Sequence, residues 1–403
     1  MKHVIIGTGA AGITAAKTIR SIDPGAQITM ISSDGAIYSR SMLHYYISDE
    51  KGEGKLAFVG KDFFDDNNIE WIKGTKATGI DTENRIVAYN TGTVNYDRLL
   101  IATGAESVIP PVGAFREAAN VFSLRHLSDA RNIKEIAKAA NSAVIVGAGL
   151  VGLDAAYSLL RIGKKVTVVE IADRVLALNL DRHASLAYQK KFEEAGCVFY
   201  LGNRAADTVC AGSNVTSVIL DSGERLDCDM VVVAVGVRPA VEVLSGGSIV
   251  YDKAIAVDGY MRTNVDGVFA AGDVTGLSGI WPNAAKQGEV AAKNMCGQEV
   301  EYTDQFALKN TINFYGLTAL SIGKLEPGEG DREIIIEDRK SYKKVILTGN
   351  TVSGVVLQGD ISNSGYWQHM IKNNIELKEG YPVFKTSFAD YFGLDADSNY
   401  VWN

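Results

Sequence analysis

The sequence predicts an α/β protein in which one strand–turn–helix unit occurs twice, followed by a smaller domain of short strands. The first copy reads HVIIGTGAAGITAAKTI from His3, and the second reads AVIVGAGLVGLDAAYSL from Ala143. Each copy opens with a short β-branched run, typical of a buried parallel strand, and continues into an alanine-rich helix. From about residue 306 the pattern changes to short strands separated by turns, which indicates a separate C-terminal domain.

The glycines of the two copies stand at the same relative positions, namely Gly7, Gly9 and Gly12, and Gly147, Gly149 and Gly152. In such a unit the first glycine makes a tight turn, the second lets the backbone approach a pyrophosphate, and the third lets helix and strand pack closely. The helix N-terminus then points at the anion. A single GxGxxG is weak evidence, but two in the correct context predict two dinucleotide-binding sites. The residues that open the two helices complete these candidate sets: Ala10, Ala11, Leu150 and Val151.

The two copies also match further along the chain. The next strand, ITMIS, ends at Ser32 in the first copy, and VTVVE ends at Glu170 in the second. A later strand closes on glycine in both copies, YDRLLIATG at Gly104 and CDMVVVAVG at Gly236. The repeat therefore covers entire domains. Four residues of these later strands join the candidate sites: Ala102, Thr103, Gly104 and Gly236.

The end of the second strand distinguishes the two sites. A carboxylate there accepts hydrogen bonds from an adenosine ribose and disfavours a 2′-phosphate. Glu170 lies 23 residues after the first glycine of its turn (170 − 147), close to the expected spacing of about 20. We therefore expect NAD rather than NADP in the second copy, although the nearby Arg174 is able to pair with a phosphate. In the first copy the ribose contact is expected from Ser32, Ser33 or Asp34, without a choice among them.

The composition is that of a soluble globular protein and excludes several classes of partner. A chain of 403 residues predicts two or three domains. The net charge of −8 argues against nucleic acid or an anionic membrane, since both require a basic surface. The longest apolar run is far shorter than the ~20 residues of a membrane span. The N-terminal run MKHVIIGTGAAGITAA places its glycines as a dinucleotide turn does, so we expect structure rather than a signal peptide, in a cytoplasmic protein.

The four cysteines, Cys197, Cys210, Cys228 and Cys296, are not spaced as metal or redox motifs are. Their spacing excludes a zinc ribbon, an iron–sulfur cluster built from this chain alone, and a thioredoxin-like CxxC. We expect reduced and mostly buried thiols, and no bound metal.

A third motif, RTNVDGVFAAGDVTG from Arg262 to Gly276, is the most specific in the chain. It closely resembles the second flavin signature of the pyridine nucleotide–disulfide oxidoreductase class. The resemblance implies that the chain binds FAD, with Asp273 at the ribityl chain and Gly272 beside it. It also implies that the following helix, NAAKQGEVAAKNM with Ala284, points its N-terminal amides at the pyrimidine end of the flavin. Those amides favour negative charge on the reduced ring.

This resemblance covers about the first three-quarters of the chain and implies a glutathione-reductase-like fold. That fold has two tandem Rossmann-like dinucleotide-binding domains plus a small α+β C-terminal domain, which serves as an interface domain in the family. The implied FAD domain is split into residues 1–108 and 239–305, the NAD domain spans 109–238, and the C-terminal domain spans 306–403. Two prolines in IPPVG suit an extended connector between the first two domains.

Within this class the chain most resembles NADH:rubredoxin oxidoreductase and the FAD-containing modules of nitrite-reductase type. The segment YSRSML resembles the tyrosine–arginine–x–x–leucine segment of that group, with Ser41 where proline is usual. Asp154 stands where many members carry a glutamate near the nicotinamide. The resemblance therefore implies a role for Asp154 at the nicotinamide, although its side chain is shorter.

The segment YSRSMLHYYIS, Tyr38 to Ser48, contains no cysteine, and neither does the wider window from Ala36 to Glu50. Disulfide reductases of this class carry CxxxxC on the first flavin-side helix. Peroxidases, water-forming oxidases and coenzyme A disulfide reductases carry one cysteine nearby. Because a thiolate relay needs a sulfur atom, we expect the flavin to be the last redox centre of this chain. A flavin accepts a hydride and is able to release electrons singly.

Other residues of this segment are candidates for the flavin site. Arg40 suits the FAD pyrophosphate, because a guanidinium binds phosphate in a bidentate manner; the alternative is a surface salt bridge. His44 is a candidate for tuning the protonation of the flavin; the alternative is an ordinary packed side chain. We expect Tyr45 and Tyr46 in the core.

In the C-terminal region, EIIIED, KKVILTGN and VSGVVLQGD predict a small antiparallel meander, and SGYWQHMIKNN predicts a helix after it. The aromatic tail, residues 381–403, is expected either to pack on this domain or to dock a partner subunit. The densest basic cluster, and so the candidate docking patch for a carrier, is DRKSYKK with Arg339, Lys340, Lys343 and Lys344.

Together these features predict an FAD-containing NAD(P)H oxidoreductase. It would transfer a hydride from NADH to FAD and pass electrons to a one-electron protein acceptor, either a rubredoxin-like carrier or a metalloenzyme partner, in a direction that is open. One alternative is an NADH oxidase that reduces oxygen directly. Another is an FAD- and NAD-binding electron-transfer subunit of a larger complex with little activity alone. Homo- and hetero-oligomers are both compatible with the sequence.

Overall fold

The computed structural model of the chain describes residues 1–244, 247–303, 310–378, 382–397 and 400–402. These residues form two compact units. The first unit comprises Met1–Gly147, Val151–Val169 and Arg204–Gln305. The second unit comprises Ala148–Leu150, Glu170–Asn203 and Phe306–Asn403.

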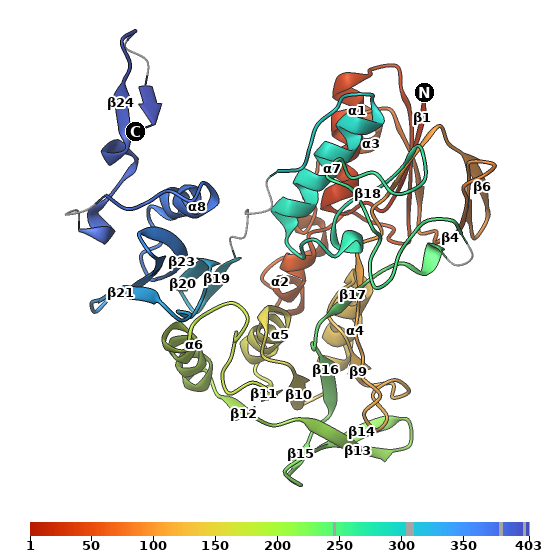
Figure 1. Cartoon of the computed structure of the whole chain (residues 1–403). Helices are drawn as coiled ribbons and strands as arrows, with labels where there is room; N and C mark the ends of the chain where they lie inside the picture. The colour runs from red at the N-terminus through yellow and green to blue at the C-terminus, as the bar shows by residue number, and fades with distance from the viewer. Residues whose placement is uncertain (245–246, 304–309, 379–381, 398–399, 403) are drawn as a thin grey trace. The chain divides into compact units, whose positions relative to one another are not determined.

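The first unit contains a parallel sheet with the strand order β18-β7-β1-β2-β3. In that order the strands are Val268–Ala270, Arg98–Ile101, Lys2–Ile6, Gln27–Ser32 and Ile69–Lys73. Helices α1 (Ala10–Ile22) and α7 (Trp281–Met295) lie side by side along one face, as Figure 1 shows. Their close approach depends on Gly288, where a Cβ atom would lie 2.2 Å from the carbonyl oxygen of Ala11.

Alternating side chains of this sheet divide between two cores, as expected of strands with a period of two. Ile5 of β1 packs with the residues of α1 and α7. Its neighbours Val4 and Ile6 pack on the opposite face against an antiparallel sheet. That sheet consists of β4 (Ala77–Asp81), β5 (Ile86–Tyr89) and β6 (Gly92–Asn95).

The part of a second sheet that belongs to the first unit has the order β11-β10-β16-β9, and its pairs are parallel. The strands are Lys165–Glu170, Ser142–Val146, Met230–Val233 and Val121–Phe122. Two helices accompany them, α4 (Leu127–Ala137) and α5 (Leu150–Arg161). An antiparallel sheet follows, formed by β13 (Ala205–Ala211), β14 (Asn214–Leu220) and β15 (Arg225–Asp227). Two parallel sheets, each with its glycine turn and helix, are the predicted Rossmann-like arrangement, and the predicted fold class is confirmed.

Strands β8 (Ala105–Ser107) and β17 (Val237–Pro239) follow the two sheets and pair with each other in antiparallel fashion. The predicted domain boundaries near residues 108 and 239 fall at the ends of this strand pair. The domain division as a whole stays a prediction, and its positions 245–246 and 304–309 lie outside the described residues. Shorter helical segments of the unit are α2 (Leu43–Ile47), α3 (Phe63–Asp66), and single turns at Arg40–Met42, Glu53–Lys55, Glu242–Leu244 and Asp273–Thr275.

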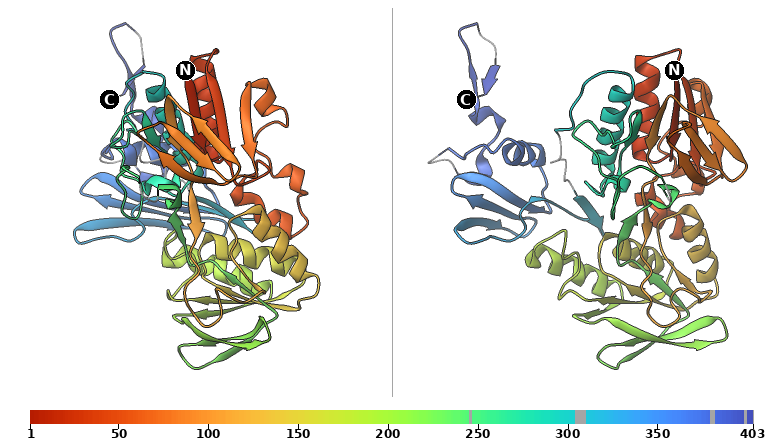
Figure 2. Two further views of the ribbon diagram at one scale, coloured as in Figure 1. Left: turned by 90° about the vertical axis from the view of Figure 1, so that its right-hand side faces the viewer. Right: turned by 45° about the vertical axis from the view of Figure 1, so that its right-hand side comes forward.

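The second unit contains an antiparallel sheet with the order β19-β20-β23-β22-β21. Its strands are Asn310–Phe314, Leu317–Gly323, Thr351–Gln358, Tyr342–Thr348 and Asp331–Glu337. Helix α8 (Ser364–Lys372) packs Trp367 and Met370 into the core of this sheet, which Figure 2 shows in blue beside the helix. The same unit includes α6 (Arg182–Glu194) and β12 (Cys197–Leu201).

The predicted meander and helix of this region are therefore confirmed as β21, β22, β23 and α8, while β19 and β20 were missed. The tail carries turns at Val383–Lys385 and Phe388–Asp390 and a strand pair of β24 (Phe392–Leu394) with β25 (Tyr400–Trp402). Its positions 381, 398–399 and 403 lie outside the described residues. In the part of the chain that the structure describes, no helix has the length and apolar character needed to cross a membrane.

Candidate functional site

The first glycine turn lies between β1 and α1 and has the geometry that the sequence predicts. Gly7 adopts φ +112°, and a Cβ atom there would lie 2.1 Å from the carbonyl oxygen of Ala102. A Cβ at Gly12 would lie 2.0 Å from the carbonyl oxygen of Gly7. At Gly9, by contrast, a Cβ would meet no atom of the described residues within 4 Å. The turn is therefore tight at its first and third glycines and open at its second, as close approach of a pyrophosphate requires.

The second glycine turn, between β10 and α5, repeats this geometry. Gly147 has φ +107°, and a Cβ there would lie 2.3 Å from the carbonyl oxygen of Ala234. A Cβ at Gly152 would lie 1.9 Å from the carbonyl oxygen of Gly147. Within the described ranges, the space around Gly149 holds nothing within 4 Å of such an atom.

The helix starts at both turns are the predicted ones. α1 begins at Ala10 and includes Ala11, and no side chain in the described part of the chain caps its first turn. α5 begins at Leu150 and continues with Val151. Because the first amides of a helix have no partner within it, these starts offer donors to an anion.

The carboxylate at the end of β11 is held by the backbone. Glu170 accepts hydrogen bonds from the amide of Ala148 at 2.6 Å and from the amide of Ala172 at 2.8 Å. Each carboxylate oxygen keeps a second lone pair, so Glu170 is fixed beside the second glycine turn and still able to accept from a ribose.

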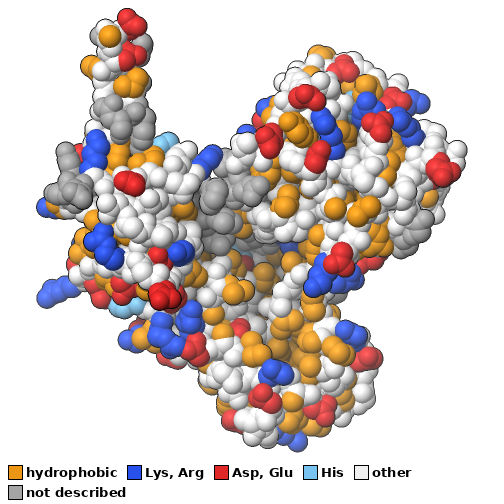
Figure 3. Space-filling model, in the orientation of Figure 1, with side chains coloured by type: hydrophobic (Ala, Val, Ile, Leu, Met, Phe, Trp, Pro, Cys, Tyr) orange, Lys and Arg blue, Asp and Glu red, His pale blue; other side chains and the backbone are white. Residues whose placement is uncertain are grey.

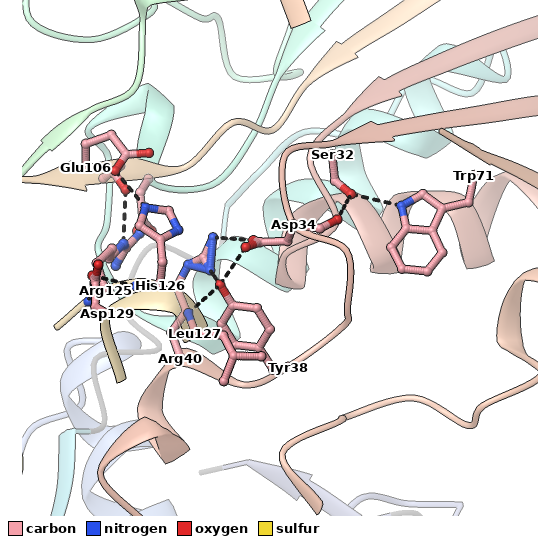
Figure 4. A network of polar contacts seen from close by, with 12 residues as sticks. Ser32, Asp34, Tyr38, Arg40, Trp71, Glu106, Arg125, His126, Leu127 and Asp129 are labelled. Atoms are coloured by element: carbon pink, nitrogen blue, oxygen red, sulfur yellow. Dashed lines mark hydrogen bonds and ion pairs between the residues drawn. The ribbon is translucent and has the colours of Figure 1, made fainter. Parts of the chain in front are cut away.

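The corresponding strand end in the first copy is part of a polar network (Figure 4). Ser32 Oγ donates to the carbonyl oxygen of Asp34 at 2.8 Å and accepts from Trp71 Nε1 at 2.9 Å. Asp34 accepts from the Tyr38 hydroxyl at 2.8 Å and pairs with Arg40 at 3.3 Å. Ser33 is exposed. The three ribose candidates thus lie together, and Asp34 is the one that also fixes Arg40.

Tyr38 connects this network to α4. Its hydroxyl accepts from the amide of Leu127 at 3.1 Å, and burial raises the pKa of the phenol. The Arg40 guanidinium is about one-third exposed, so it keeps donors available after pairing with Asp34.

The third motif places Asp273 next to an arginine that the sequence analysis missed. Arg125 Nη2 donates to Asp273 Oδ2 at 2.7 Å, and Arg125 Nε donates to the carbonyl oxygen of Ala105 at 3.0 Å. Both side chains of the ion pair are largely buried, at 19% and 18% exposure. The start of α4 fixes Arg125, because Asp129 accepts from the amides of Arg125 and His126. The signal for this cap was visible as an aspartate three residues after His126.

A second charged pair stands beside Arg125. His126 Nε2 and Glu106 Oε2 are 2.7 Å apart, and this hydrogen bond lowers the pKa of Glu106. Figure 4 shows this pair, Arg125 and Asp129 from the α4 side together with Arg40 and Asp34 from the first strand end. One polar cluster thus joins the residues after β2 to the start of α4.

The start of α7 has the unpaired polar groups that suit a bound polar ligand. Gly272, at φ +83°, would place a Cβ 3.2 Å from that of Ala11 and 3.7 Å from that of Ala284. Its amide donates to Gln287 Oε1 at 2.8 Å. Asn283 Oδ1 and Gln287 Nε2 are buried and have no hydrogen-bond partner among the residues described. Buried polar atoms normally have partners, so these orphans favour a ligand at this helix start.

The remaining strand-end candidates also take backbone positions beside the turns. Thr103 Oγ1 donates to the carbonyl oxygen of Ala240 at 2.7 Å, and Gly104 has φ +75°. Gly236 has φ +117° and accepts from the amide of Val108 at 3.0 Å.

The two catalytic candidates, His44 on α2 and Asp154 on α5, lie together. His44 Nδ1 and Asp154 Oδ1 are 3.3 Å apart, without the angle of a hydrogen bond. Burial lowers the pKa of His44 to about 4, and burial raises the pKa of Asp154 well above its ordinary value. Near neutral pH the imidazole is therefore uncharged, and it faces a carboxyl group whose burial favours the protonated form.

The neighbouring tyrosines correct one expectation. Tyr45 and Tyr46 are half-buried rather than core residues. Lys51 lies 4.9 Å from the ring centroid of Tyr45, and Lys134 lies 4.3 Å from that of Tyr46. The rings have these cations beside them because α2 is a short helix that buries only part of its surface.

The expected basic patch in the C-terminal domain also needs correction. Lys344 is buried and lies within 3.2–3.4 Å of three carboxylates, those of Asp181, Glu326 and Glu333. Lys343 pairs with Asp360. Arg339 and Lys340, in the exposed turn after β21, remain at the surface.

The four cysteines are all free thiols. Cys197 and Cys228 are buried, and burial raises the pKa of each thiol to about 12. Burial also raises the pKa of the half-buried Cys296, whereas Cys210 is exposed on β13. Thiols with raised pKa values are poor nucleophiles, so Cys197, Cys228 and Cys296 are not candidates for thiolate chemistry.

Two family models match this chain. The pyridine nucleotide-disulphide oxidoreductase model matches residues 1–288, and the rubredoxin NAD+ reductase C-terminal domain model matches residues 309–375. The first match covers more than half of the chain. The chain belongs to the pyridine nucleotide-disulphide oxidoreductase family. It is an oxidoreductase that uses FAD and NAD(H), which confirms the predicted family, enzyme class and cofactors.

Relatives in this family have different overall lengths. The nitrite reductase (NAD(P)H) of Bacillus subtilis is 28% identical over 386 residues, which are 93% of this chain and 48% of that protein. The chain therefore spans about half the length of that relative. The epsilon subunit of NADH-dependent phenylglyoxylate dehydrogenase from Aromatoleum evansii is 29% identical over 394 residues, covering 93% and 92% of the two chains.

A third relative, NADH-rubredoxin oxidoreductase of Clostridium acetobutylicum, is 28% identical over 369 residues and covers 90% of this chain and 92% of that protein. The crystal structure of the NADH:rubredoxin oxidoreductase from that organism matches with a TM-score of 0.77 at 26% identity, covering 95% and 98% of the two chains.

Proposed function

We propose that this protein transfers a hydride from NADH to FAD and passes electrons to a one-electron protein acceptor. The observation that carries the proposal is the lack of cysteine between Ala36 and Glu50, where Arg40 and His44 stand instead. The buried and half-buried cysteines elsewhere have raised pKa values and do not replace that thiol. Without a thiol relay, the flavin is the last redox centre of the chain.

The first glycine turn is the proposed FAD site and the second is the proposed NADH site. Four features support FAD at the first turn: the open backbone at Gly9, the Asp273 carboxylate, the uncapped start of α7 in the described structure, and the orphaned Asn283 and Gln287 groups. Glu170 supports NADH at the second turn. The proposed domains are those expected from the sequence: residues 1–108 and 239–305 for FAD, 109–238 for NAD, and 306–403 for the interface.

The residues of the chain would bind and orient the two cofactors. The amides at the starts of α1 and α7 would face the pyrophosphate and the pyrimidine end of FAD, and Asp273, fixed by Arg125, would bind the ribityl hydroxyls. Arg40 would contribute a guanidinium to the pyrophosphate. Bound FAD would supply hydride acceptance and single-electron release. His44 and Asp154 would stand at the nicotinamide side, His44 as an uncharged imidazole and Asp154 as a carboxyl group whose protonated form burial favours.

The proposed acceptor is either a small iron protein or a metalloenzyme partner. The NADH-rubredoxin oxidoreductase relative supports the first, because the chain covers most of that protein. The phenylglyoxylate dehydrogenase epsilon relative favours the second, in which the chain is an electron-transfer subunit of a larger, cytoplasmic complex. On the face shown in Figure 3, acidic and basic side chains are interspersed. Docking on the C-terminal domain would thus use local groups such as the exposed Arg339 and Lys340.

The proposal is tested by comparing acceptors. The purified, FAD-loaded protein would be mixed anaerobically with NADH and then with a one-electron carrier, a disulfide, or peroxide, and separately with air. Fast reduction of the carrier, with slow or no reduction of disulfide and peroxide, is expected. A disulfide or peroxide as the best acceptor would contradict the proposal, and rapid NADH consumption in air without a carrier would favour an oxidase.

A further inference from the structure

Arg174 carries a guanidinium group, which is suited to binding phosphate, close to the carboxylate that ends β11. It lies four residues after Glu170 in the loop that follows β11. An arginine near this strand end is what accommodates the 2′-phosphate of NADP in dinucleotide sites. Its Nε atom is buried and makes no hydrogen bond within the described residues. The chain thus carries both the carboxylate that favours NADH and a cation that suits NADPH.

Two carboxylates hold this guanidinium. Asp173 Oδ1 lies 3.3 Å from Arg174 Nη1, and Glu326 Oε1 lies 3.9 Å from Arg174 Nη2. Glu326 belongs to the connection between β20 and β21, so it is contributed by the C-terminal sheet. The Arg174 side chain is only 23% exposed. Its positive charge is therefore opposed on one side by the loop of the coenzyme site and on the other by the C-terminal domain.

The surroundings of Glu326 are acidic overall. Its second oxygen lies 3.2 Å from the buried Lys344 Nζ. Lys344 also pairs with Asp181 at 3.3 Å and Glu333 at 3.4 Å. Asp173 further pairs with Arg182. In this network three cations face five carboxylates when Glu170 is included, so a second anion brought by a 2′-phosphate would meet net negative charge.

We propose that Glu326 restrains Arg174 and thereby makes the C-terminal domain a determinant of the preference for NADH over NADPH. The inference rests on the proposed NADH site at the second glycine turn. Exposed or half-exposed ion pairs contribute little to protein stability. We therefore expect the Arg174–Glu326 pair to change the difference in affinity between NADH and NADPH rather than the stability of the fold. An Arg174 released from Glu326 is free to bind the 2′-phosphate with its fork of donors.

The test measures binding of two adenosine probes to the full chain by titration calorimetry, AMP and adenosine 2′,5′-bisphosphate. Glu326→Gln should tighten the bisphosphate about five- to tenfold and leave AMP unchanged, as expected for one released charge-assisted contact. Glu333→Gln is the matched control. It removes the same charge beside the same lysine but does not touch Arg174, so it should shift neither probe by more than about twofold. Adding Arg174→Ala to Glu326→Gln should abolish the gain.

A second variant is needed because Glu326→Gln also removes a carboxylate from the buried Lys344 and could impair folding. Asp173→Asn frees Arg174 from its other side and should also tighten the bisphosphate selectively. Two results would overturn the inference without affecting the proposed coenzyme site. One is an equal change in bisphosphate affinity in Glu326→Gln and Glu333→Gln, and the other is tighter bisphosphate binding that persists when Arg174→Ala is added. If Glu170→Ala leaves AMP binding unchanged, the proposed site itself is wrong, and this inference is overturned with it.

Discussion

The two glycine turns of this protein share one backbone but differ in the residues around it. Gly7 and Gly147 have φ angles of +112° and +107°, and each leaves no room for a Cβ beside the neighbouring strand. Beyond the turns the copies diverge. Asp34 is tied to Tyr38 and Arg40, whereas Glu170 is held by backbone amides.

The first copy also has Asp273 and the start of α7 beside it, where Gly272 lies close to Ala11 and Ala284. From this difference we infer that the turn selects the class of ligand, a dinucleotide. We propose that the strand-end side chain and the added helix then select which dinucleotide binds. Mutations in the turns and mutations in the surrounding side chains test these two roles separately.

The largest expected effect tests whether both turns share the same steric rule. Gly7→Ala and Gly147→Ala should each lower the free energy of unfolding by about 3 kcal/mol or more, because both a positive φ and a backbone contact oppose the methyl group. Gly9→Ala and Gly149→Ala, where the described residues leave open space, should fold with melting temperatures near that of the parent. Thermal melts of the four variants make the comparison.

The same open-position variants separate the two sites. Gly9→Ala should lose FAD, whereas Gly149→Ala should keep FAD and lose NADH binding. Loss of both ligands from either variant would contradict the assignment of one dinucleotide to each turn.

The next largest expected effect is on FAD binding, and it tests whether Asp273 completes the site at the first glycine turn. Asp273→Ala should weaken FAD binding roughly 10- to 100-fold, the value of a hydrogen-bonded charged group, and should purify largely colourless. Flavin absorbance per chain measures it. Asp266→Asn, at the exposed end of the same motif, is the control and should keep its flavin. A fully flavinated Asp273→Ala protein would break the distinction between the two copies.

Acid should destabilise the protein through buried histidines. Burial lowers the pKa of His44 to about 4 from 6.5, so between these values the unfolded chain takes a proton that the folded chain does not. Stability therefore falls as the pH is lowered through this window, by about 2 kcal/mol between pH 7 and pH 5 at ~1.4 kcal/mol per pKa unit.

Melts at the two pH values should show a smaller loss for His44→Gln than for the parent. His3, on β1, has a pKa lowered in the same way and should behave alike. The raised pKa of Asp154 has the opposite effect on stability, because a buried carboxyl group destabilises the folded state as the pH rises and the group must ionise. An unchanged pH dependence in His44→Gln would show that His44 is solvated.

The smallest expected effect is on coenzyme preference, and it tests the role of Glu170 at the second glycine turn. Glu170→Ala should reduce the ratio of kcat/KM for NADH over NADPH by about tenfold, since it removes acceptors for the ribose hydroxyls. The steady-state ratio with both coenzymes measures it. Equal wild-type efficiency with NADH and NADPH would contradict the role given to Glu170.

Much of this architecture follows from periodicity and glycine position. The two turns, their helices and the strand β18 before Asp273 carry patterns in which each residue type has one steric reason, so the sequence predicts them. Arg125 was missed because its role depends on a contact with Asp273, 148 residues away in sequence. The meeting of His44 with Asp154 was missed for the same reason. Lys344 looked like surface charge because sequence alone does not show that three carboxylates converge on it.

The C-terminal sheet shows the same limit in another form. Strands β21, β22 and β23 are marked by isoleucine and valine runs between turns. β19 and β20, in NTINFYGLTALSIG, mix polar and apolar residues, and their pairing with β23 sets their structure more than their own composition does.

The central claim is that electrons leave from the flavin without passing through a thiol. The most direct measurement is anaerobic stopped-flow of a variant in which Cys197, Cys210, Cys228 and Cys296 are all serine, reduced with NADH and mixed with a one-electron carrier. Flavin absorbance would follow the return of oxidised FAD. The account predicts reoxidation within about twofold of the parent rate in a folded, flavinated variant. A folded, flavinated variant that NADH reduces but that cannot pass electrons to the carrier would contradict it.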